Sequence, residues 1–301
     1  MISRDQLKER FRKIAVWRNG DQRAPHKPLL ILYALSRLDS AASGKIAYKD
    51  VDEALRPLLA QFGPSRKSYY PELPFWHLQT DGIWELNIDP ATIPHRKGSK
   101  NPTKGQLLSQ DVRGGFSSEI YTALKEDPFL VSEVVSEILE SHFPSSMHDE
   151  ILASVGLELQ RATVIKQPRD AAFRETVLRA YEYRCAVCDF DIRIGNQTLG
   201  IEAAHVKWHQ AGGPSTADNG VALCILHHKM FDYGAFTMSQ NTHKVIVSEK
   251  AHGTSGFHDL LMQYHGKPLR QPINPLYLVN DVYVQWHENE VFKKPARHLE
   301  L

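Results

Sequence analysis

The chain reads Cys185-Ala186-Val187-Cys188, then Glu202-Ala203-Ala204-His205, and then Asn219-Gly220-Val221-Ala222-Leu223-Cys224-Ile225-Leu226-His227-His228, and this stretch decides its fold class. Cysteine and histidine come here in closely spaced pairs. A gap of two residues within a pair lets both side chains reach one metal ion from a tight turn. The spacing therefore predicts a tetrahedral zinc site formed by Cys185, Cys188, Cys224 and His227.

A zinc site of this kind has four protein ligands and no open position, so the ion would hold the fold together and take no part in a reaction. Thiolate ligands also favour zinc over magnesium. The chain has only three cysteines, all within this stretch, and an uneven number argues against a disulfide framework. Three buried free thiols are the alternative interpretation.

Length and composition predict two folded domains. A single hydrophobic core rarely grows past about 250 residues, and this chain has 301. The net charge of +1 neither demands nor excludes a nucleic-acid partner. No apolar run approaches the roughly 20 residues that span a bilayer, and the N-terminus has no apolar signal segment. We therefore expect a cytoplasmic protein that does not bind membranes.

The second domain is expected over residues 168–301. An amphipathic helix is predicted at 169–183, ahead of the cysteine pairs. Short strand-like runs follow at 198–205, 235–238 and 244–248. This mixture of one helix and short strands indicates a small α+β domain built around the metal site.

Residues 169–248 as a whole resemble the HNH (ββα-metal) nuclease family, in particular its McrA-like branch. The resemblance rests on the pattern YRCAVC…EAAHVKWHQAGG…NGVALCILHHKMFD. It implies that His205 is the general base that activates water for attack on phosphorus, a role that suits an imidazole near neutral pH. It also implies that Asn219 fixes the loop that orients this imidazole, and that His228 is a ligand of a catalytic Mg²⁺ or Mn²⁺ ion.

The sequence departs from the family pattern at two positions. Many members have an aspartate just before the base histidine as a second metal ligand, and Ala204 stands there. Glu202 and Asp232 are the candidates to replace it: Glu202 shares a strand face with Ala204, and Asp232 follows His228 by one helical turn. The second ligand of the catalytic metal stays unassigned. The other departure is a histidine at 227 where a cysteine is commoner, which leaves zinc binding intact.

The first 145 residues are predicted to form a separate, mostly helical domain, joined to the second by a linker at 146–167. Helices are expected over residues 7–17, 28–35, 51–62 and 129–143. The aromatic segment 69–78 contains two prolines, which argue against a regular element. Residues 94–105 form a basic loop without an acidic residue.

Three short segments of this first domain resemble the sulfur-binding domain of restriction enzymes that recognise phosphorothioated DNA. They are Arg23-Ala24-Pro25-His26-Lys27-Pro28-Leu29-Leu30, Tyr69-Tyr70-Pro71 with Phe75-Trp76-His77-Leu78, and Gly114-Gly115-Phe116. The resemblance covers about residues 4–130 and implies a small apolar pocket for the sulfur that replaces a phosphate oxygen. Because sulfur is more polarisable and more weakly hydrated than oxygen, an apolar concavity discriminates in its favour.

The resemblance also implies which side chains contact the DNA. We expect Tyr70 and the ring of Pro71 to lie against the sulfur. Phosphates are expected at Arg23, His26 and Lys27, near the mouth of a helix. A Tyr-Pro dipeptide is also a common turn, so a purely local role for this pair remains the alternative.

Two further segments are expected at the DNA. The basic loop, with Arg96 and Lys97 and the nearby Lys100 and Lys104, would reach toward a groove and read base edges. Gly114 and Gly115 would let the backbone approach the DNA closely. A merely solvated surface explains the basic loop equally well.

The predicted fold class is α+β: a mostly helical N-terminal DNA-reading domain and a zinc-stabilised ββα-metal (HNH) nuclease domain. The predicted function is that of a modification-dependent restriction endonuclease. It would bind phosphorothioated double-stranded DNA and hydrolyse phosphodiester bonds nearby with a divalent metal. One HNH site cuts one strand, so a homodimer is one route to a double-strand break.

Two alternatives stay open. In the first, the N-terminal domain reads methylated or unmodified DNA, since the aromatic residues Tyr69, Tyr70, Phe75 and Trp76 offer a cage for a flipped base. In the second, the protein is a non-catalytic, zinc-stabilised DNA-binding protein. The set His205, Asn219 and His228 argues against the second alternative.

Overall fold

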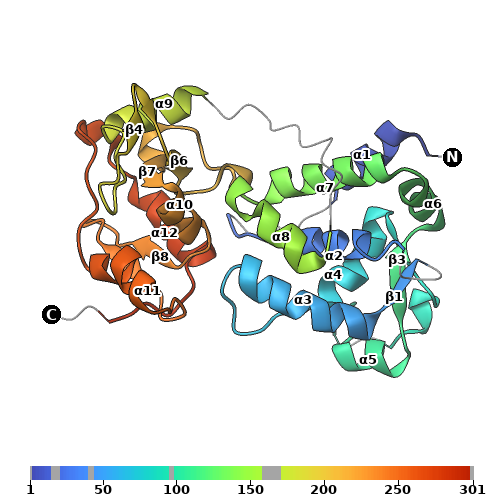
Figure 1. Cartoon of the computed structure of the whole chain (residues 1–301). Helices are drawn as coiled ribbons and strands as arrows, with labels where there is room; N and C mark the ends of the chain where they lie inside the picture. Colours follow the sequence, from blue (N-terminus) through green and yellow to red (C-terminus); the bar gives the residue numbers. More distant parts are fainter. Residues whose placement is uncertain (1, 15–20, 40–43, 95–97, 158–170, 299–301) are drawn as a thin grey trace. The chain divides into compact units, whose positions relative to one another are not determined.

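The computed structural model describes residues 2–14, 21–39, 44–94, 98–157 and 171–298, which divide into two compact units (Figure 1). The first unit comprises Met1–Asn19 and Ala24–Ile165, and the second comprises Gly20–Arg23 and Lys166–Leu301. The chain therefore leaves the first unit for a few residues between its first two helices and then returns to it.

The first unit is mostly helical. Its helices are α1 (Arg4–Arg12), α2 (His26–Leu35), α3 (Tyr48–Phe62), α4 (Glu72–His77), α5 (Lys104–Ser109), α6 (Ser118–Glu126), α7 (Pro128–His142) and α8 (His148–Val155). Helix α2 is apolar on every side from Leu29 to Leu35 and is buried throughout this range. It packs against α3, α4, α7 and α8, and these four helices surround it.

A small antiparallel sheet closes one side of this unit. Its strands are β1 (Lys45–Ala47), β2 (Trp84–Leu86) and β3 (Arg113–Phe116), in the order β1-β3-β2. A chain of edge-to-face aromatic contacts joins the sheet to the helices. It runs from Tyr48 to Phe75, Trp84 and Phe116, with ring centroids 5.1–5.9 Å apart.

The second unit is built around two antiparallel strands, β6 (Ile201–His205) and β7 (Gly220–Cys224). Helix α10 (Ile225–Asp232) begins directly after β7 and contacts both strands, and α9 (Ala171–Ala180) also packs on them. The remaining elements are β4 (Arg193–Ile194), β5 (Gln197–Thr198), β8 (Phe236–Met238), β9 (Val245–Val247), α11 (Ser255–Leu260) and α12 (Asp281–Glu290). A hairpin followed at once by a helix is the ββα arrangement.

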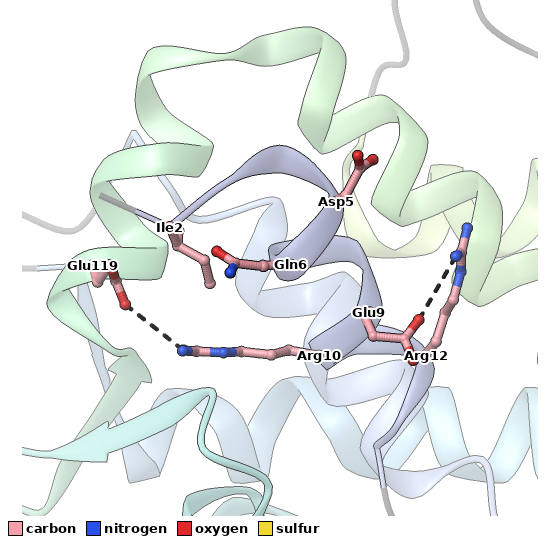
Figure 2. Close-up of a pocket in the computed structure, with 7 residues that line it drawn as sticks. All are labelled: Ile2, Asp5, Gln6, Glu9, Arg10, Arg12 and Glu119. Atoms are coloured by element: carbon pink, nitrogen blue, oxygen red, sulfur yellow. Dashed lines mark ion pairs between the residues drawn. The ribbon is translucent and has the colours of Figure 1, made fainter.

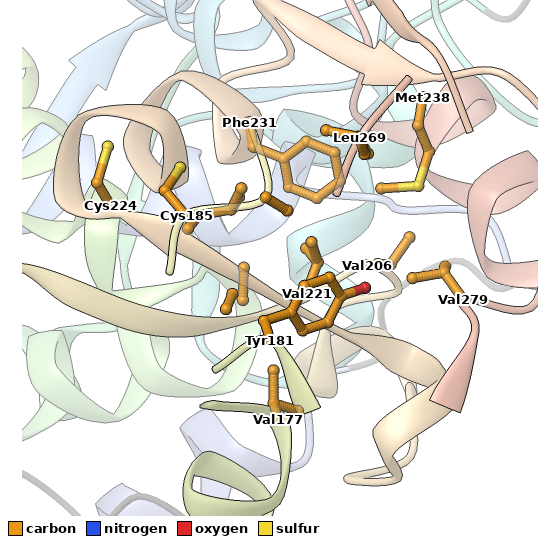
Figure 3. Close-up of a cluster of buried hydrophobic side chains, with 14 of the residues drawn as sticks. Val177, Tyr181, Cys185, Val206, Val221, Cys224, Phe231, Met238, Leu269 and Val279 are labelled. Atoms are coloured by element: carbon orange, nitrogen blue, oxygen red, sulfur yellow. The ribbon is translucent and has the colours of Figure 1, made fainter. Parts of the chain in front are cut away.

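One apolar cluster holds the second unit together (Figure 3). Val177 reaches it from α9, Tyr181 from the turn after α9, Val221 from β7 and Phe231 from α10. Cys185 and Cys224 lie in the same cluster, so metal ligands and core are continuous. The position of the ligands is therefore fixed by packing on the strands.

The predicted α+β class is confirmed, and so are the helices expected at 28–35, 51–62 and 129–143. Two features differ from expectation. The segment 69–78 was expected to be irregular, but it contains helix α4, because Pro71 is the N-cap and Pro74 falls in the first turn, where the missing N–H costs nothing. The three-stranded sheet was not foreseen, since strands of three residues carry no clear alternation.

Residues 148–155, which the sequence placed in a linker, form α8. This helix packs against α2 and α3 within the first unit, with Ile151 and Val155 buried. Among the described helices, none is long and apolar enough to cross a membrane.

Candidate nuclease site and DNA-reading segments

The four predicted zinc ligands meet at one point. Cys185 and Cys188 lie in the turn after α9, Cys224 ends β7, and His227 lies in the first turn of α10. The Cys188 and Cys224 Sγ atoms are 4.0 Å apart. The His227 Nδ1 atom lies 3.1 Å from Cys224 Sγ and 3.5 Å from Cys185 Sγ. All four ligand atoms lie within 4.8 Å of one another, so the spacing prediction is confirmed as a cluster that can hold a metal ion.

A hydrogen bond at Nε2 determines that the Nδ1 atom of His227 faces the cluster. Its Nε2 atom donates a hydrogen bond to the Leu260 carbonyl at 2.7 Å. The proton therefore belongs to Nε2, and Nδ1 presents its lone pair to the three sulfur atoms. Hydrogen bonds from the Cys185 and Cys188 thiols lower the pKa of Cys224, which gives its sulfur thiolate character.

The imidazole of His205 is held at the end of β6. Its ring stacks on Phe173 of α9, with centroids 3.9 Å apart and planes inclined by 17°. Its Nε2 atom is 3.3 Å from the Ser215 hydroxyl. His205 is half-buried, so the ring is held on two sides and still reaches solvent.

Asn219 is fully buried and spans the loop that follows His205. Its Oδ1 atom accepts a hydrogen bond from the Lys207 N–H at 2.8 Å. Its Nδ2 atom donates to the carbonyls of Lys207 at 2.9 Å and Pro214 at 2.8 Å. One side chain thus satisfies three main-chain groups, and the loop from 206 to 214 is fixed relative to β7.

His228 is bracketed by two carboxylates. Its Nδ1 atom lies 2.7 Å from Glu202 Oε2 of β6, and its Nε2 atom lies 3.3 Å from Asp232 Oδ2, one turn later on α10. The side chain of Asp232 is 2% exposed and that of Glu202 is 30% exposed. Ala204, by contrast, is buried and brings no ligand atom. The two candidates that the sequence suggested in its place both touch the histidine.

In the first unit, the expected sulfur contact is an exposed aromatic ring on a fixed turn. Tyr70 is 53% exposed, while Pro71 beside it is buried and forms the N-cap of α4. Arg56 of α3 donates to the Tyr69 carbonyl at 3.1 Å and pairs with Asp52 at 2.8 Å. Arg56 therefore holds the turn at the Tyr69 carbonyl, and the Tyr70 side chain next to it is exposed.

The two expected phosphate contacts at the start of α2 are partly buried. The Lys27 ammonium group lies 2.6 Å from Asp81 Oδ2, and both side chains are nearly buried. Burial lowers the pKa of His26, and the nearby Arg66 lowers it further. The lowered pKa favours the neutral form of His26, and the Lys27 ammonium group is paired with Asp81.

The glycines at 114 and 115 have a packing role in the sheet. A Cβ on Gly115 would lie 2.0 Å from the Gly44 carbonyl oxygen. A Cβ on Gly114 would lie 2.5 Å from Trp84 Nε1 and 2.8 Å from Phe75 Cζ. Only glycine fits at these two positions, whatever else approaches the strand.

Three other expected DNA contacts are placed differently or not at all. Arg23 belongs to the second unit, where its guanidinium group lies 3.8 Å from the Trp208 ring centroid. Arg96 and Lys97 lie outside the described residues.

One groove on the described surface is lined by none of these residues (Figure 2). It has a volume of about 640 Å³ and runs along α1, between Ile2 and Arg12, with Glu119 opposite. Arg10 pairs with Glu119 and Arg12 with Glu9, each at 3.8 Å. The groove is open, and its charges neutralise one another, so it carries no sign of a ligand site.

Three supporting residues could not have been found from the sequence. Phe173, Ser215 and Lys207 surround the His205 loop, but nothing in their spacing links them to it. Phe173 was expected only as an apolar position of the helix at 169–183.

A ββα hairpin with a four-ligand cluster at its base and His205, Asn219 and His228 arranged around it defines the HNH class of nuclease domain. Residues 185–239 match the family model described as HNH endonuclease. Residues 4–160 match the model described as ScoMcrA-like, DNA sulfur-binding domain. This second match covers more than half of the chain, and the chain belongs to that family.

Several solved structures are similar to part of the chain. The sulfur-binding domain of ScoMcrA in complex with phosphorothioated DNA is 20% identical, with 50% of this chain and 94% of that chain covered and a TM-score of 0.42. That of SprMcrA is 22% identical, with 52% and 95% covered and a TM-score of 0.43. The phosphorothioation-dependent restriction endonuclease ScoMcrA is 19% identical, with 58% and 38% covered and a TM-score of 0.41. No curated protein matches the chain.

Proposed function

We propose that this protein is a modification-dependent restriction endonuclease that binds phosphorothioated DNA through its first unit and hydrolyses a phosphodiester bond nearby with its second. The observation that carries the proposal is the presence in one chain of a sulfur-binding-domain match over residues 4–160 and an HNH match over residues 185–239. A nuclease that is directed by a domain recognising a DNA modification accounts for both matches. The protein would act where the DNA is, in the cytoplasm.

Zinc is the metal that fits the four-ligand cluster. Atoms about 2.0–2.3 Å from a tetrahedral ion lie about 3.5–3.8 Å from one another, and the separations found here are 3.1, 3.5 and 4.0 Å. Three sulfurs and one imidazole nitrogen are soft to borderline ligands, which suit zinc. All four ligands would come from the protein, so Cys185, Cys188, Cys224 and His227 would hold an ion that ties the hairpin to α10 and leaves no position for a reaction.

The general base would be His205. Hydrolysis requires that a water molecule lose a proton as its oxygen attacks phosphorus and that the 3′ oxygen depart. Stacking on Phe173 and the contact with Ser215 hold the imidazole at one orientation, as proton transfer demands. Asn219 would be a positioning residue, because its side chain holds the loop that continues from His205.

The catalytic divalent ion would be held by His228 and Asp232. Two ligands of an octahedral ion at about 2.1 Å lie about 3.0 Å apart when adjacent, and His228 Nε2 is 3.3 Å from Asp232 Oδ2. The 2.7 Å between Nδ1 and Glu202 is instead a hydrogen-bond length, so Nε2 would be the ligand atom of His228. Mg²⁺ or Mn²⁺ bound here would stabilise negative charge on the phosphate and the leaving oxygen.

The reader would use Tyr70 and Pro71 at the sulfur and His26 at the neighbouring phosphate. An exposed ring on an anchored turn offers the apolar, polarisable contact that favours sulfur over oxygen. A role for the basic loop with Arg96 and Lys97 remains a prediction, as does a homodimer for cutting both strands.

We also propose domain limits. The reader extends through α8, which ends at Val155, and the nuclease begins at α9 with Ala171. This moves the end of the first domain about ten residues beyond the 145 that the sequence suggested.

A gel-shift titration tests the reader at fixed salt, because phosphate contacts make affinity salt-dependent. Two duplexes of one sequence, with and without a single phosphorothioate, are compared without divalent metal. We expect tighter binding to the sulfur-bearing duplex, and loss of that preference in Tyr70→Ala. Equal binding would refute sulfur reading, and tighter binding of a methylated duplex would establish the first alternative.

A metal-dependence assay tests the nuclease. With Mg²⁺ or Mn²⁺ the full chain is expected to cut, and His205→Ala is expected to lose at least 100-fold in rate while binding DNA normally. A wild-type protein that binds but never cuts would establish the non-catalytic alternative.

A further inference from the structure

Asp21 and Arg23 belong to the second unit although the helices on either side, α1 and α2, belong to the first. We name Asp21–Arg23 the strap. The Asp21 carboxylate lies 2.7 Å from the Lys207 ammonium group. The Asp21 carbonyl accepts a hydrogen bond from Trp286 Nε1 at 2.8 Å. The strap is thus attached at its first residue by both an ion pair and a main-chain bond.

Arg23 attaches the other end of the strap. Its main-chain N–H donates to Glu290 Oε2 at 2.8 Å, and its guanidinium group donates to the Glu290 carbonyl at 3.0 Å. The same guanidinium group lies over Trp208, 3.8 Å from the ring centroid. Trp208 in turn meets Trp286 edge to face, with centroids 5.9 Å apart. Five interactions therefore hold the side chains and main chain of Asp21 and Arg23 against the rest of the second unit.

The strap contacts two parts of the second unit, α12 and the loop after His205. Lys207 and Trp208 follow the base histidine by two and three residues, and their side chains are 11% and 2% exposed. The backbone of Lys207 is the part that Asn219 clamps through its N–H and carbonyl groups. The strap and Asn219 thus hold the same residue from two directions, one at the side chain and one at the main chain.

At its other end the strap continues directly into the reader. Arg23 is three residues before His26, the first residue of α2, and Pro25 is the N-cap of this helix. Three residues span at most about 10 Å, and proline restricts the backbone further. A displacement of the start of α2 beyond this reach would therefore pull on the strap.

We propose that the strap is a positioning device, in which Asp21 and Arg23 hold the His205 loop in its cutting geometry and couple that geometry to the DNA-binding state of the reader. This proposal rests on the proposed function. It gives Arg23 a docking role in place of the phosphate contact expected from the sequence. The energetic link runs through one ion pair and one stacked guanidinium group, so it is open to direct test.

The experiment uses the zinc-loaded full chain and reverses the ion pair. Affinity for the phosphorothioated duplex is measured without divalent metal, and the single-turnover cleavage rate is measured at saturating protein with Mn²⁺. We expect Asp21→Lys to change the affinity less than threefold and to lower the cleavage rate at least tenfold. The double variant Asp21→Lys with Lys207→Asp is expected to recover most of the rate, which assigns the loss to the ion pair. A general loss of structure would lower the affinity as well as the rate. Gln22→Ala, an exposed position of the same strap, is the matched control and should match wild type in both measurements.

The contrary outcomes are distinct. Wild-type cleavage by Asp21→Lys would refute the strap, as would affinity that falls in proportion to the rate. If Asp21→Lys loses zinc or melts early, Asp21→Asn replaces it, since this change removes the charge without introducing repulsion, and the same criteria apply. A wild-type protein that neither prefers the sulfur-bearing duplex nor cuts would refute the proposed function instead.

Discussion

Replacing Asn219 with alanine removes three hydrogen bonds to the main chain of the His205 loop at once. Each such bond contributes about 1 kcal/mol, and its loss inside a buried site also leaves a main-chain group without a partner. We therefore expect Asn219→Ala to lower the free energy of unfolding of the second unit by about 3–4 kcal/mol. For a unit of this size, that is a fall of roughly 10 °C in Tm.

Calorimetry of the zinc-loaded full chain measures this change, with Asn289→Ala as the control. Asn289 is exposed and accepts a single bond, from Lys294, so its replacement should cost less than about 0.5 kcal/mol. Asn219→Asp is a sharper variant, because a carboxylate keeps the acceptor for the Lys207 N–H but cannot donate to the two carbonyls. It should be as unstable as Asn219→Ala. A loss below about 1 kcal/mol in both variants would refute the clamp.

Three further predictions concern the metal, pH and the sheet. Cys188→Ser should lose the bound zinc, measured by metal analysis, and unfold the second unit earlier; full zinc content in this variant would contradict the ligand assignment. Burial lowers the pKa of His287 to about 3. The charge of Arg23 lowers it too, while the hydrogen bond to the Phe231 carbonyl acts in the opposite direction. Since this folded value is below the unfolded one, the full stability is present above about pH 6.5, and the free energy of unfolding decreases as pH falls, by about 2 kcal/mol at pH 5. Urea titrations at several pH values should therefore show that the free energy of unfolding depends more steeply on pH in wild type than in His287→Gln. An equal pH dependence in the two proteins would contradict the prediction. Gly115→Ala should destabilise the first unit by about 1–3 kcal/mol, because its Cβ would lie 2.0 Å from a carbonyl oxygen; Gly105→Ala, which meets nothing nearer than 4.0 Å, should be neutral or better, and equal melting of the two would refute the packing role.

The nuclease site could be predicted from the sequence to the extent that its geometry is local. Cys185 and Cys188 are joined by a turn, and Cys224 and His227 by the start of a helix, so their spacing alone determines that each pair converges. The pairing of β6 with β7 then follows from the ββα resemblance. The sequence leaves the choice between Glu202 and Asp232 open, because it depends on how each carboxylate lies relative to His228 in the folded chain.

The rest depends on contacts between residues far apart in the sequence. Arg23 was expected at the DNA from its neighbours in the chain, yet its partners Trp208 and Glu290 lie about 185 and 267 positions away. The sheet of the first unit was missed for a similar reason. Gly114 and Gly115 lie in the middle strand, where neighbouring residues leave no room for a Cβ. A glycine pair in a sequence does not reveal this constraint.

The central claim is that a phosphorothioate directs cutting by this chain, and mapping the cut sites on one duplex tests it most directly. A long duplex with a single phosphorothioate at a known position is incubated with the full chain and Mn²⁺, beside the same duplex with oxygen at that position. The account predicts cuts at a narrow set of distances from the sulfur, absent from the oxygen duplex and from His205→Ala. Cuts of equal rate and position on both duplexes would contradict it, even if the protein proved to be an active nuclease.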